Sequence, residues 1–172
     1  RQYTQTYPLH PTEHACKTQS MTLSHDQLEF YRQNGYLLVH DIITPELVAE
    51  YRRLYDRFLD GSISTGANRS DLGAGLGKST TGENITQIMW PSDFAPEVLD
   101  MPYHQNALSI ARQLLGADIE MDFDMLINKA PHTNTPTPWH QDAAYWVNMP
   151  DKRAASCWMA LDPATIDNGC MW

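Results

Sequence analysis

Two side chains in the second half of the chain have the types and the spacing of metal ligands. His140 and Asp142 are two residues apart. In extended backbone, residues i and i+2 leave the same face, so the imidazole and the carboxylate point toward one place. They supply two members of a 2-His-1-carboxylate facial triad, which holds Fe(II) and leaves other coordination positions open. The alternative interpretation is a surface histidine beside a solvated aspartate.

Aromatic side chains crowd this pair in the sequence. Trp139 precedes it, and Tyr145 and Trp146 follow it. We expect them to form a wall that excludes water and shapes a substrate pocket, although ordinary core aromatics would give the same pattern. Asn128 lies on the polar side of an alternating segment, in position to contact a ligand. A turn residue at the end of a strand is its other interpretation.

Local signals predict the elements that must position these residues. Ser24 and Gln27 form a capping box that starts a helix over about 25–34, and Gly35 ends it. Thr44 before Pro45 starts a second helix, which ends at Gly61. The remaining predicted elements are a helix over 103–115 and strands at 36–39, 85–90, 119–127 and 156–162.

The strand predicted over 119–127 has the most regular pattern in the chain. Its apolar row alternates with mostly polar residues, so we expect that row to pack and the other face to carry the polar groups. The row consists of Ile119, Met121, Phe123, Met125 and Ile127. Because helices come first and strands afterwards, without β–α alternation, the predicted class is α+β with a mainly antiparallel sheet.

Residues 61–82 hold six of the nine glycines and predict a long loop. The stretch GAGLGKS resembles a phosphate-binding loop, but it lacks the required spacing and a preceding strand. One interpretation is a mobile loop at the mouth of the active site that orders on substrate binding. The other is a surface linker without a role.

The composition limits the classes of protein that fit. A chain of 172 residues that is 42% hydrophobic and 19% charged suits one globular domain. The net charge of −9 disfavours nucleic acid and anionic membranes as partners. The three cysteines form no CxxC pair, which indicates free thiols and a cytoplasmic protein. Residues 1–22 show no periodicity, so we expect a disordered extension there and a domain over 23–172.

The stretch TPWHQDAAYW, preceded by MLINK and followed by ASCWMALDPATIDNGCMW, resembles the phytanoyl-CoA dioxygenase family of Fe(II)/2-oxoglutarate oxygenases. The opening LSHDQLEFYRQNGYLLVHDIITPELV is also similar, so the resemblance covers about 23–172. It implies a double-stranded β-helix (jelly-roll) core with flanking N-terminal helices. It also implies an enzyme that uses Fe(II), 2-oxoglutarate and O₂ to hydroxylate a small molecule, with decarboxylation of 2-oxoglutarate to succinate.

The resemblance assigns roles to individual residues. His140 and Asp142 match the first two iron ligands of the catalytic site, and a carboxylate at 142 favours hydroxylation over halogenation. The residues that match co-substrate contacts are Asn128, Met125, Trp158 and, in the loosest alignment, Gln87. The aromatic residues Trp139, Tyr145 and Trp146 are expected on the substrate side.

The chain departs from the family pattern downstream of His140. The family's second iron histidine and its 2-oxoglutarate-binding arginine lie on a later strand. Here no histidine follows His140, and Arg153 comes too early to match. We therefore expect the chain to hold the N-terminal part of the barrel, with His132 as an alternative third ligand.

Two further expectations concern function. A non-catalytic jelly-roll domain that binds a ligand, or an inactive fragment, is the alternative to an enzyme. With few basic residues to meet phosphates, a small metabolite is favoured over an acyl-CoA as the substrate.

Overall fold

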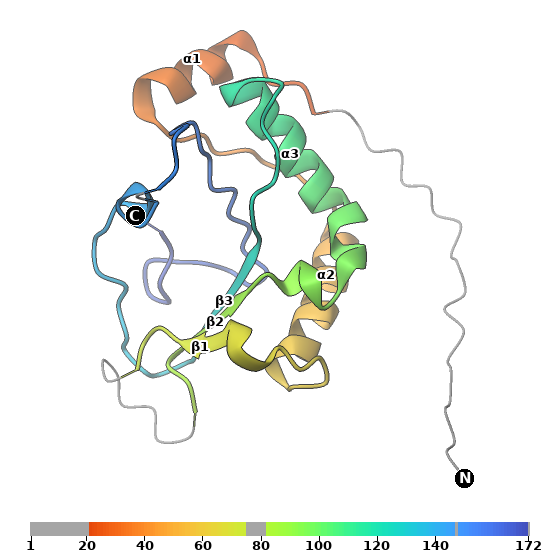
Figure 1. Ribbon diagram of the computed structural model, residues 1–172, viewed down its shortest axis with the longest axis vertical. Helices are drawn as coiled ribbons and strands as arrows, with labels where there is room; N and C mark the ends of the chain where they lie inside the picture. The colour runs from red at the N-terminus through yellow and green to blue at the C-terminus, as the bar shows by residue number, and fades with distance from the viewer. Residues whose placement is uncertain (1–20, 75–81, 147, 172) are drawn as a thin grey trace.

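The computed structural model describes residues 21–74, 82–146 and 148–171, and it places helices beside a small antiparallel sheet (Figure 1). The helices are α1 (His25–Asn34), α2 (Pro45–Leu59) and α3 (Pro102–Leu115), and the strands are β1 (Arg69–Asp71), β2 (Ile85–Met89) and β3 (Met125–Lys129). Short 3-10 turns are η1 (Gly66–Asn68), η2 (Pro91–Asp93), η3 (Pro96–Asp100) and η4 (Asp142–Ala144). This arrangement confirms an α+β class; the jelly-roll closure stays a prediction.

The helices begin and end where the local signals predict. The side chain of Ser24 accepts from the Gln27 backbone and the Gln27 side chain returns to Ser24, which completes the capping box of α1. Gly35 ends α1 in the left-handed region, at φ 78°. Thr44 caps α2 ahead of Pro45. Among the described residues, no helix combines the length and the hydrophobicity that crossing a membrane requires.

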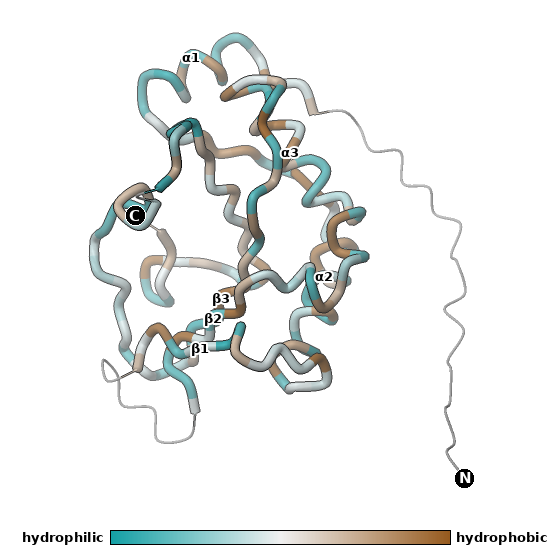
Figure 2. The backbone as a smooth tube through the Cα atoms, viewed as in Figure 1, coloured by the Kyte–Doolittle hydropathy of each residue, from teal (hydrophilic) through white to brown (hydrophobic). Residues whose placement is uncertain are grey.

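The three strands pair in the order β1-β2-β3, and both pairings are antiparallel. Ile88 of β2 lies opposite Leu126 of β3, and both side chains pack with Phe58 of α2 in the buried core. Figure 2 shows that β2 and β3 are the hydrophobic part of this sheet. In the view of Figure 1, residues 130–146 run along the side of the molecule opposite α2 and α3.

The sheet is shorter than predicted, and its orientation differs. Only Met125–Lys129 of the alternating segment forms a strand, and Leu126 faces the core because it is paired with Ile88. The apolar row that we expected to pack is instead partly open to solvent. Its exposed members are Met121, Phe123, Met125 and Ile127, at 36–42% exposure.

Two predicted strands are wrong. Residues 36–39 and 156–162 form no ladder, and Tyr36 and Leu38 are 62% and 69% exposed. A strand needs a neighbour for its backbone hydrogen bonds and a surface for its apolar face. Residues 156–162 contact α3 instead, where the Tyr103 hydroxyl donates to the Cys157 carbonyl at 2.7 Å.

The glycine-rich segment, predicted as a long loop, contributes a strand to the sheet. It contains η1 and β1, while residues 75–81 and most of GAGLGKS lie outside the described part of the chain. The Asp71 carboxylate accepts from the backbone N–H groups of Gly73 and Ile85, both at 2.8 Å. A Cβ atom at Gly73 would lie 2.6 Å from the Asn84 Cβ. Glycine therefore lets the chain turn closely against β2.

The start of the described chain is held against α3. The side-chain amide of Gln113 donates to the Met21 carbonyl, and its oxygen accepts from the Leu23 N–H, both at 2.8 Å. The two bonds fix Met21 and Leu23 beside α3. Residues 1–20 of the predicted extension lie outside the described part of the chain, so the boundary at residue 23 stays a prediction.

Candidate active site

The His140–Asp142 pair forms as its spacing predicts. Gln141 between them is extended, at φ −117° and ψ 123°, and Asp142 opens the turn η4. The two side chains therefore leave the same side of the backbone. His140 Nε2 lies 3.2 Å from Asp142 Oδ1, and the side chains are 43% and 52% exposed.

The hydrogen bonds around the pair decide which atoms are free to bind. His140 Nδ1 lies 2.8 Å from the Pro138 carbonyl oxygen. A carbonyl only accepts, so Nδ1 carries a proton, and the neutral ring then presents its Nε2 lone pair to Asp142. The second carboxylate oxygen of Asp142 accepts from the Ser156 hydroxyl at 3.3 Å. Tyr145 meets the His140 ring edge-on, with centroids 6.2 Å apart.

Two acceptors that face one another require a cation between or beside them. The Nε2 lone pair and the Asp142 carboxylate repel unless the imidazole gains a second proton or a metal ion binds both. Two ligand atoms about 2.1 Å from one metal, at right angles, stand about 3 Å apart. The 3.2 Å separation fits that geometry. The Pro138 and Ser156 contacts are the outer hydrogen bonds that metal-binding histidines and carboxylates usually have.

The third ligand of a facial triad is not found in the described part of the chain. There, no three His, Cys, Asp or Glu side chains gather into a metal-binding group, so His132 does not join the pair. Arg153, the one arginine after His140, makes its contacts elsewhere. It pairs with Asp118 at 2.6 Å and Asp151 at 2.7 Å, and it donates to the Leu115 carbonyl at the end of α3.

The sheet separates the residues that match co-substrate contacts. Gln87 donates from Nε2 to the Met125 sulfur at 2.7 Å, so these two meet on the open face. Asn128 lies opposite Thr86, one position from Ile127. Since successive side chains of a strand alternate between faces, Asn128 lies on the other face of the sheet from Met125. The structure therefore brings Gln87 and Met125 together and leaves Asn128 apart.

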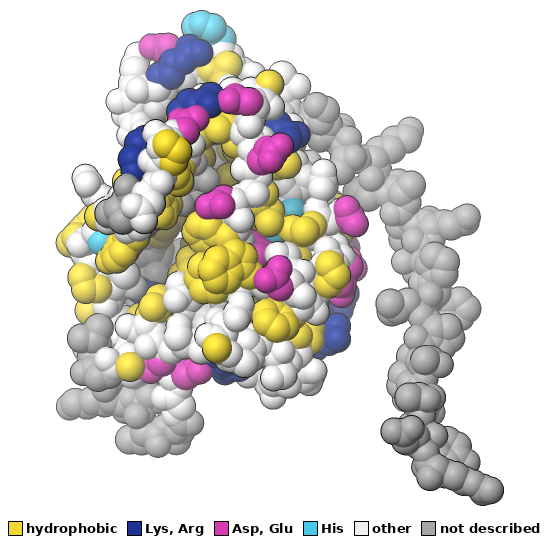
Figure 3. Space-filling view, in the orientation of Figure 1, with side chains coloured by type: hydrophobic (Ala, Val, Ile, Leu, Met, Phe, Trp, Pro, Cys, Tyr) yellow, Lys and Arg dark blue, Asp and Glu magenta, His cyan; other side chains and the backbone are white. Residues whose placement is uncertain are grey.

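The aromatic wall around the His–Asp pair is not formed. Trp139 is 87% exposed and Tyr145 75%, while Trp146 is half-buried. Trp158, which was expected at the co-substrate and not in the wall, is 52% exposed. Neither a water-excluding wall nor a packed core describes Trp139 and Tyr145, because no described segment covers them. Figure 3 shows one face of the molecule, where hydrophobic side chains gather beside a hollow in the surface.

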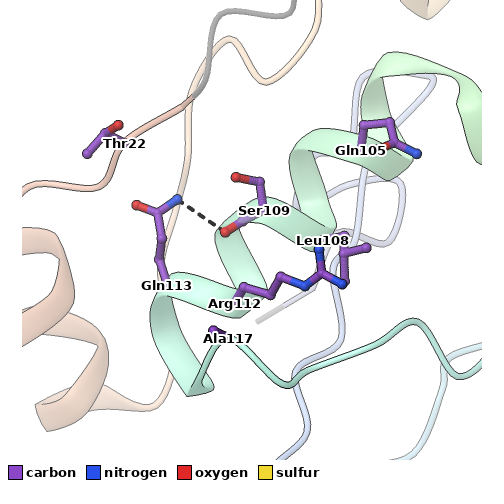
Figure 4. A pocket seen from close by; sticks show the side chains of 7 residues that line it. All are labelled: Thr22, Gln105, Leu108, Ser109, Arg112, Gln113 and Ala117. Carbon is purple, nitrogen blue, oxygen red and sulfur yellow. Dashed lines mark hydrogen bonds between the residues drawn. The ribbon is translucent and has the colours of Figure 1, made fainter.

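A cavity lies along α3. It has a volume of about 460 Å³ and opens along the outer side of α3, where Gln113 donates to the Ser109 carbonyl (Figure 4). Its polar lining residues include Arg112 and Thr22, and none of the predicted site residues borders it. This cavity is therefore separate from the His140–Asp142 pair.

Ser156 is the site residue that sequence reasoning missed. The serine stands two positions before Trp158, in the segment predicted as a strand. No local pattern pointed to it, because residues 156–162 form no strand. Its contact with Asp142 joins segments 14 residues apart.

The sequence is similar to several curated proteins. A "Probable phytanoyl-CoA dioxygenase" of Caenorhabditis elegans is 27% identical over 161 residues, covering 87% of this chain and 51% of the relative. A peroxisomal phytanoyl-CoA dioxygenase of Bos taurus is 23% identical, covering 94% and 50%. An ectoine dioxygenase of Nocardia farcinica is 23% identical, covering 85% and 48%.

The chain thus spans about half the length of the curated relatives it matches. No solved structure matches significantly. The family model for phytanoyl-CoA dioxygenase matches residues 31–172, which is most of the chain and includes the His140–Asp142 pair. The chain belongs to the phytanoyl-CoA dioxygenase (PhyH) family.

Proposed function

We propose that this chain supplies part of the active site of an Fe(II)- and 2-oxoglutarate-dependent dioxygenase that hydroxylates a small molecule. The observation that carries the proposal is the 3.2 Å approach of His140 Nε2 and Asp142 Oδ1, with the Nδ1 proton held by the Pro138 carbonyl. Bound iron and 2-oxoglutarate would supply the oxidant: one oxygen atom of O₂ enters the succinate and the other enters the product.

The residues of this chain hold and orient the reacting groups. His140 and Asp142 would bind the iron through Nε2 and Oδ1, and Ser156 would keep the second carboxylate oxygen turned away. Gln87 and Met125 share the open face of the sheet, where we infer a contact with the co-substrate. Tyr145 would restrict the tilt of the imidazole through its edge-on contact.

The substrate and the compartment are also proposals. The net charge of −9 favours a small or zwitterionic metabolite over the phosphate-rich acyl-CoA class. The name ectoine dioxygenase of one relative fits such a substrate, whereas the name phytanoyl-CoA dioxygenase of others does not. A cytoplasmic location stays a prediction from the cysteine pattern. Coupled turnover of ectoine, a fatty acyl-CoA and a panel of zwitterionic metabolites would rank the substrate classes.

An anaerobic binding experiment tests the iron and co-substrate proposal. Fe(II) and 2-oxoglutarate added to the protein should give a visible charge-transfer absorption. His140→Ala and Asp142→Ala should abolish it, and His132→Ala should serve as the matched histidine control that retains it. No absorption and no succinate from the wild-type protein would refute the proposal. Ligand binding that needs no iron would favour the non-catalytic binding domain instead.

A further inference from the structure

A buried polar cluster lies away from the His140–Asp142 pair. It joins Tyr51 of α2, Ser92 of η2, His104 of α3 and Asp124, the residue directly before β3. The His104 and Asp124 side chains are only 13% and 10% exposed. Polar groups buried to this degree are costly unless each has a partner, so the cluster has a structural or functional reason to exist.

The hydrogen bonds of the cluster run in one direction. The Tyr103 N–H donates to the Tyr51 oxygen at 3.2 Å, so the Tyr51 hydrogen is left to point at His104 Nδ1, 3.4 Å away. Burial raises the pKa of Tyr51 to about 12, which keeps that hydrogen in place at neutral pH. The neutral His104 ring then carries its proton on Nε2.

The series of contacts from Tyr51 through His104, called the relay below, ends at the Asp124 carboxylate. His104 Nε2 faces Asp124 Oδ2 at 3.7 Å. Asp124 Oδ1 accepts from the Ser92 hydroxyl at 2.8 Å, and Oδ2 accepts from the Ser92 N–H at 3.2 Å. Both carboxylate oxygens therefore accept from Ser92, with the His104 ring nearby at ion-pair distance.

Asp124 also holds the backbone where β2 ends. Its carbonyl accepts from the Trp90 N–H at 3.0 Å, one step beyond the Met89–Met125 pair. Trp90 is in the left-handed region, at φ 51°. A bulky residue adopts that conformation at a cost and keeps it only when its surroundings impose it. Asp124 imposes this conformation through two contacts: its backbone carbonyl holds the Trp90 N–H, and its carboxylate holds Ser92 two residues later.

We propose that His104 and Asp124 are positioning residues that set the start of β3 and the end of β2, and thereby the Gln87–Met125 contact on the open face. Met125 follows Asp124 directly, and Gln87 is two residues before Met89 on the paired strand. The step from this contact to co-substrate binding rests on the proposed function. The relay and its hold on Trp90 do not.

The relay is tested by nuclear magnetic resonance. Long-range ¹⁵N–¹H correlations should show His104 as the Nε2–H tautomer, and Tyr51→Phe should weaken that preference. The Trp90 amide should exchange slowly in the wild type. Asp124→Ala should speed its exchange by about tenfold or more relative to the Ile88 amide. The variant keeps the backbone carbonyl that accepts from Trp90 but removes the carboxylate that holds Ser92, two residues further on. Asp124→Asn, which keeps an acceptor for Ser92, should restore most of the protection.

The binding of 2-oxoglutarate is measured in the same variants. The affinity for 2-oxoglutarate should fall by about tenfold in Asp124→Ala, the size of one charge-assisted hydrogen bond, while Fe(II) binding is retained. His25→Asn is the matched control, because the His25–Asp26 pair is fully exposed. Where Asp124→Ala fails to fold, Ser92→Ala gives the milder perturbation of the same carboxylate.

The outcomes separate this proposal from the proposed function. If Trp90 exchange follows global stability alone, or His104 is the Nδ1–H tautomer, the positioning proposal is overturned. If wild-type protein binds no 2-oxoglutarate, the proposed function fails, and the tautomer and Trp90 exchange still decide the relay. Unchanged 2-oxoglutarate affinity in Asp124→Ala, with faster Trp90 exchange, overturns the link to the open face.

Discussion

Replacing Ser156 by alanine tests whether the carboxylate of the His–Asp pair is oriented by its neighbour. The Ser156 hydroxyl donates to Asp142 Oδ2 at 3.3 Å, and the aspartate is about half exposed. A hydrogen bond to a charged group contributes about 1.5–3 kcal/mol when buried, and this long, solvated one contributes about 1 kcal/mol. We therefore expect the variant to bind Fe(II) about fivefold more weakly.

The assay is an anaerobic titration with Fe(II), followed through the charge-transfer absorption in saturating 2-oxoglutarate. Ser64→Ala, at an exposed serine outside the site, is the control that should leave the affinity unchanged. Global stability should not move in either variant, because both hydroxyls are at the surface. An affinity equal to wild type in Ser156→Ala would refute the orienting role of Ser156. A loss beyond a hundredfold would show that Ser156 binds the metal itself.

Three predictions concern the scaffold. Phe58→Ala should lower the free energy of unfolding by about 3–5 kcal/mol in urea, because the ring is 2% exposed in the core. Gly73→Ala should cost about 1–3 kcal/mol, since the new Cβ would meet the Asn84 Cβ at 2.6 Å. Stability should also fall on acidification. The hydrogen bond from the Ile85 N–H lowers the pKa of Asp71. Because the folded-state pKa of Asp71 lies below the unfolded value of about 4, its ionised carboxylate stabilises the folded state above that pH. This stabilisation is lost as the pH falls through the folded-state pKa. Asp71→Asn should flatten that part of the stability profile measured by urea unfolding between pH 6 and pH 3, and an unchanged slope would contradict the assignment.

The structure of the glycine-rich segment predicts what a deletion in it would do to stability. If residues 66–78 were only a loop, a deletion among them would change the kinetics at most, but residues 69–71 form the edge strand β1. Arg69 at its start donates to the Phe58 and Leu59 carbonyls and pairs with Glu83 at 3.0 Å. We expect the deletion to destabilise the end of α2, which circular dichroism would detect as lost helix on heating.

The sequence by itself determined the features that depend on near neighbours. The ends of α1 and α2 follow from Ser24, Gly35 and Thr44, because a cap needs only the first or last turn of its own helix. The His140–Asp142 approach follows from a spacing of two in extended chain. The motif around this pair was enough to indicate the family.

Only the tertiary structure decided the features that join distant segments. Which face of β3 is covered depends on the pairing of Leu126 with Ile88, and period-two alternation is the same for either face. The predicted strand at 156–162 had the right composition but no neighbour with which to form a ladder. His104 and Asp124 are 20 residues apart and meet only because α3 packs beside the sheet. Contacts of this kind depend on which surfaces bury one another, and that choice is made by the whole chain and not by any local pattern.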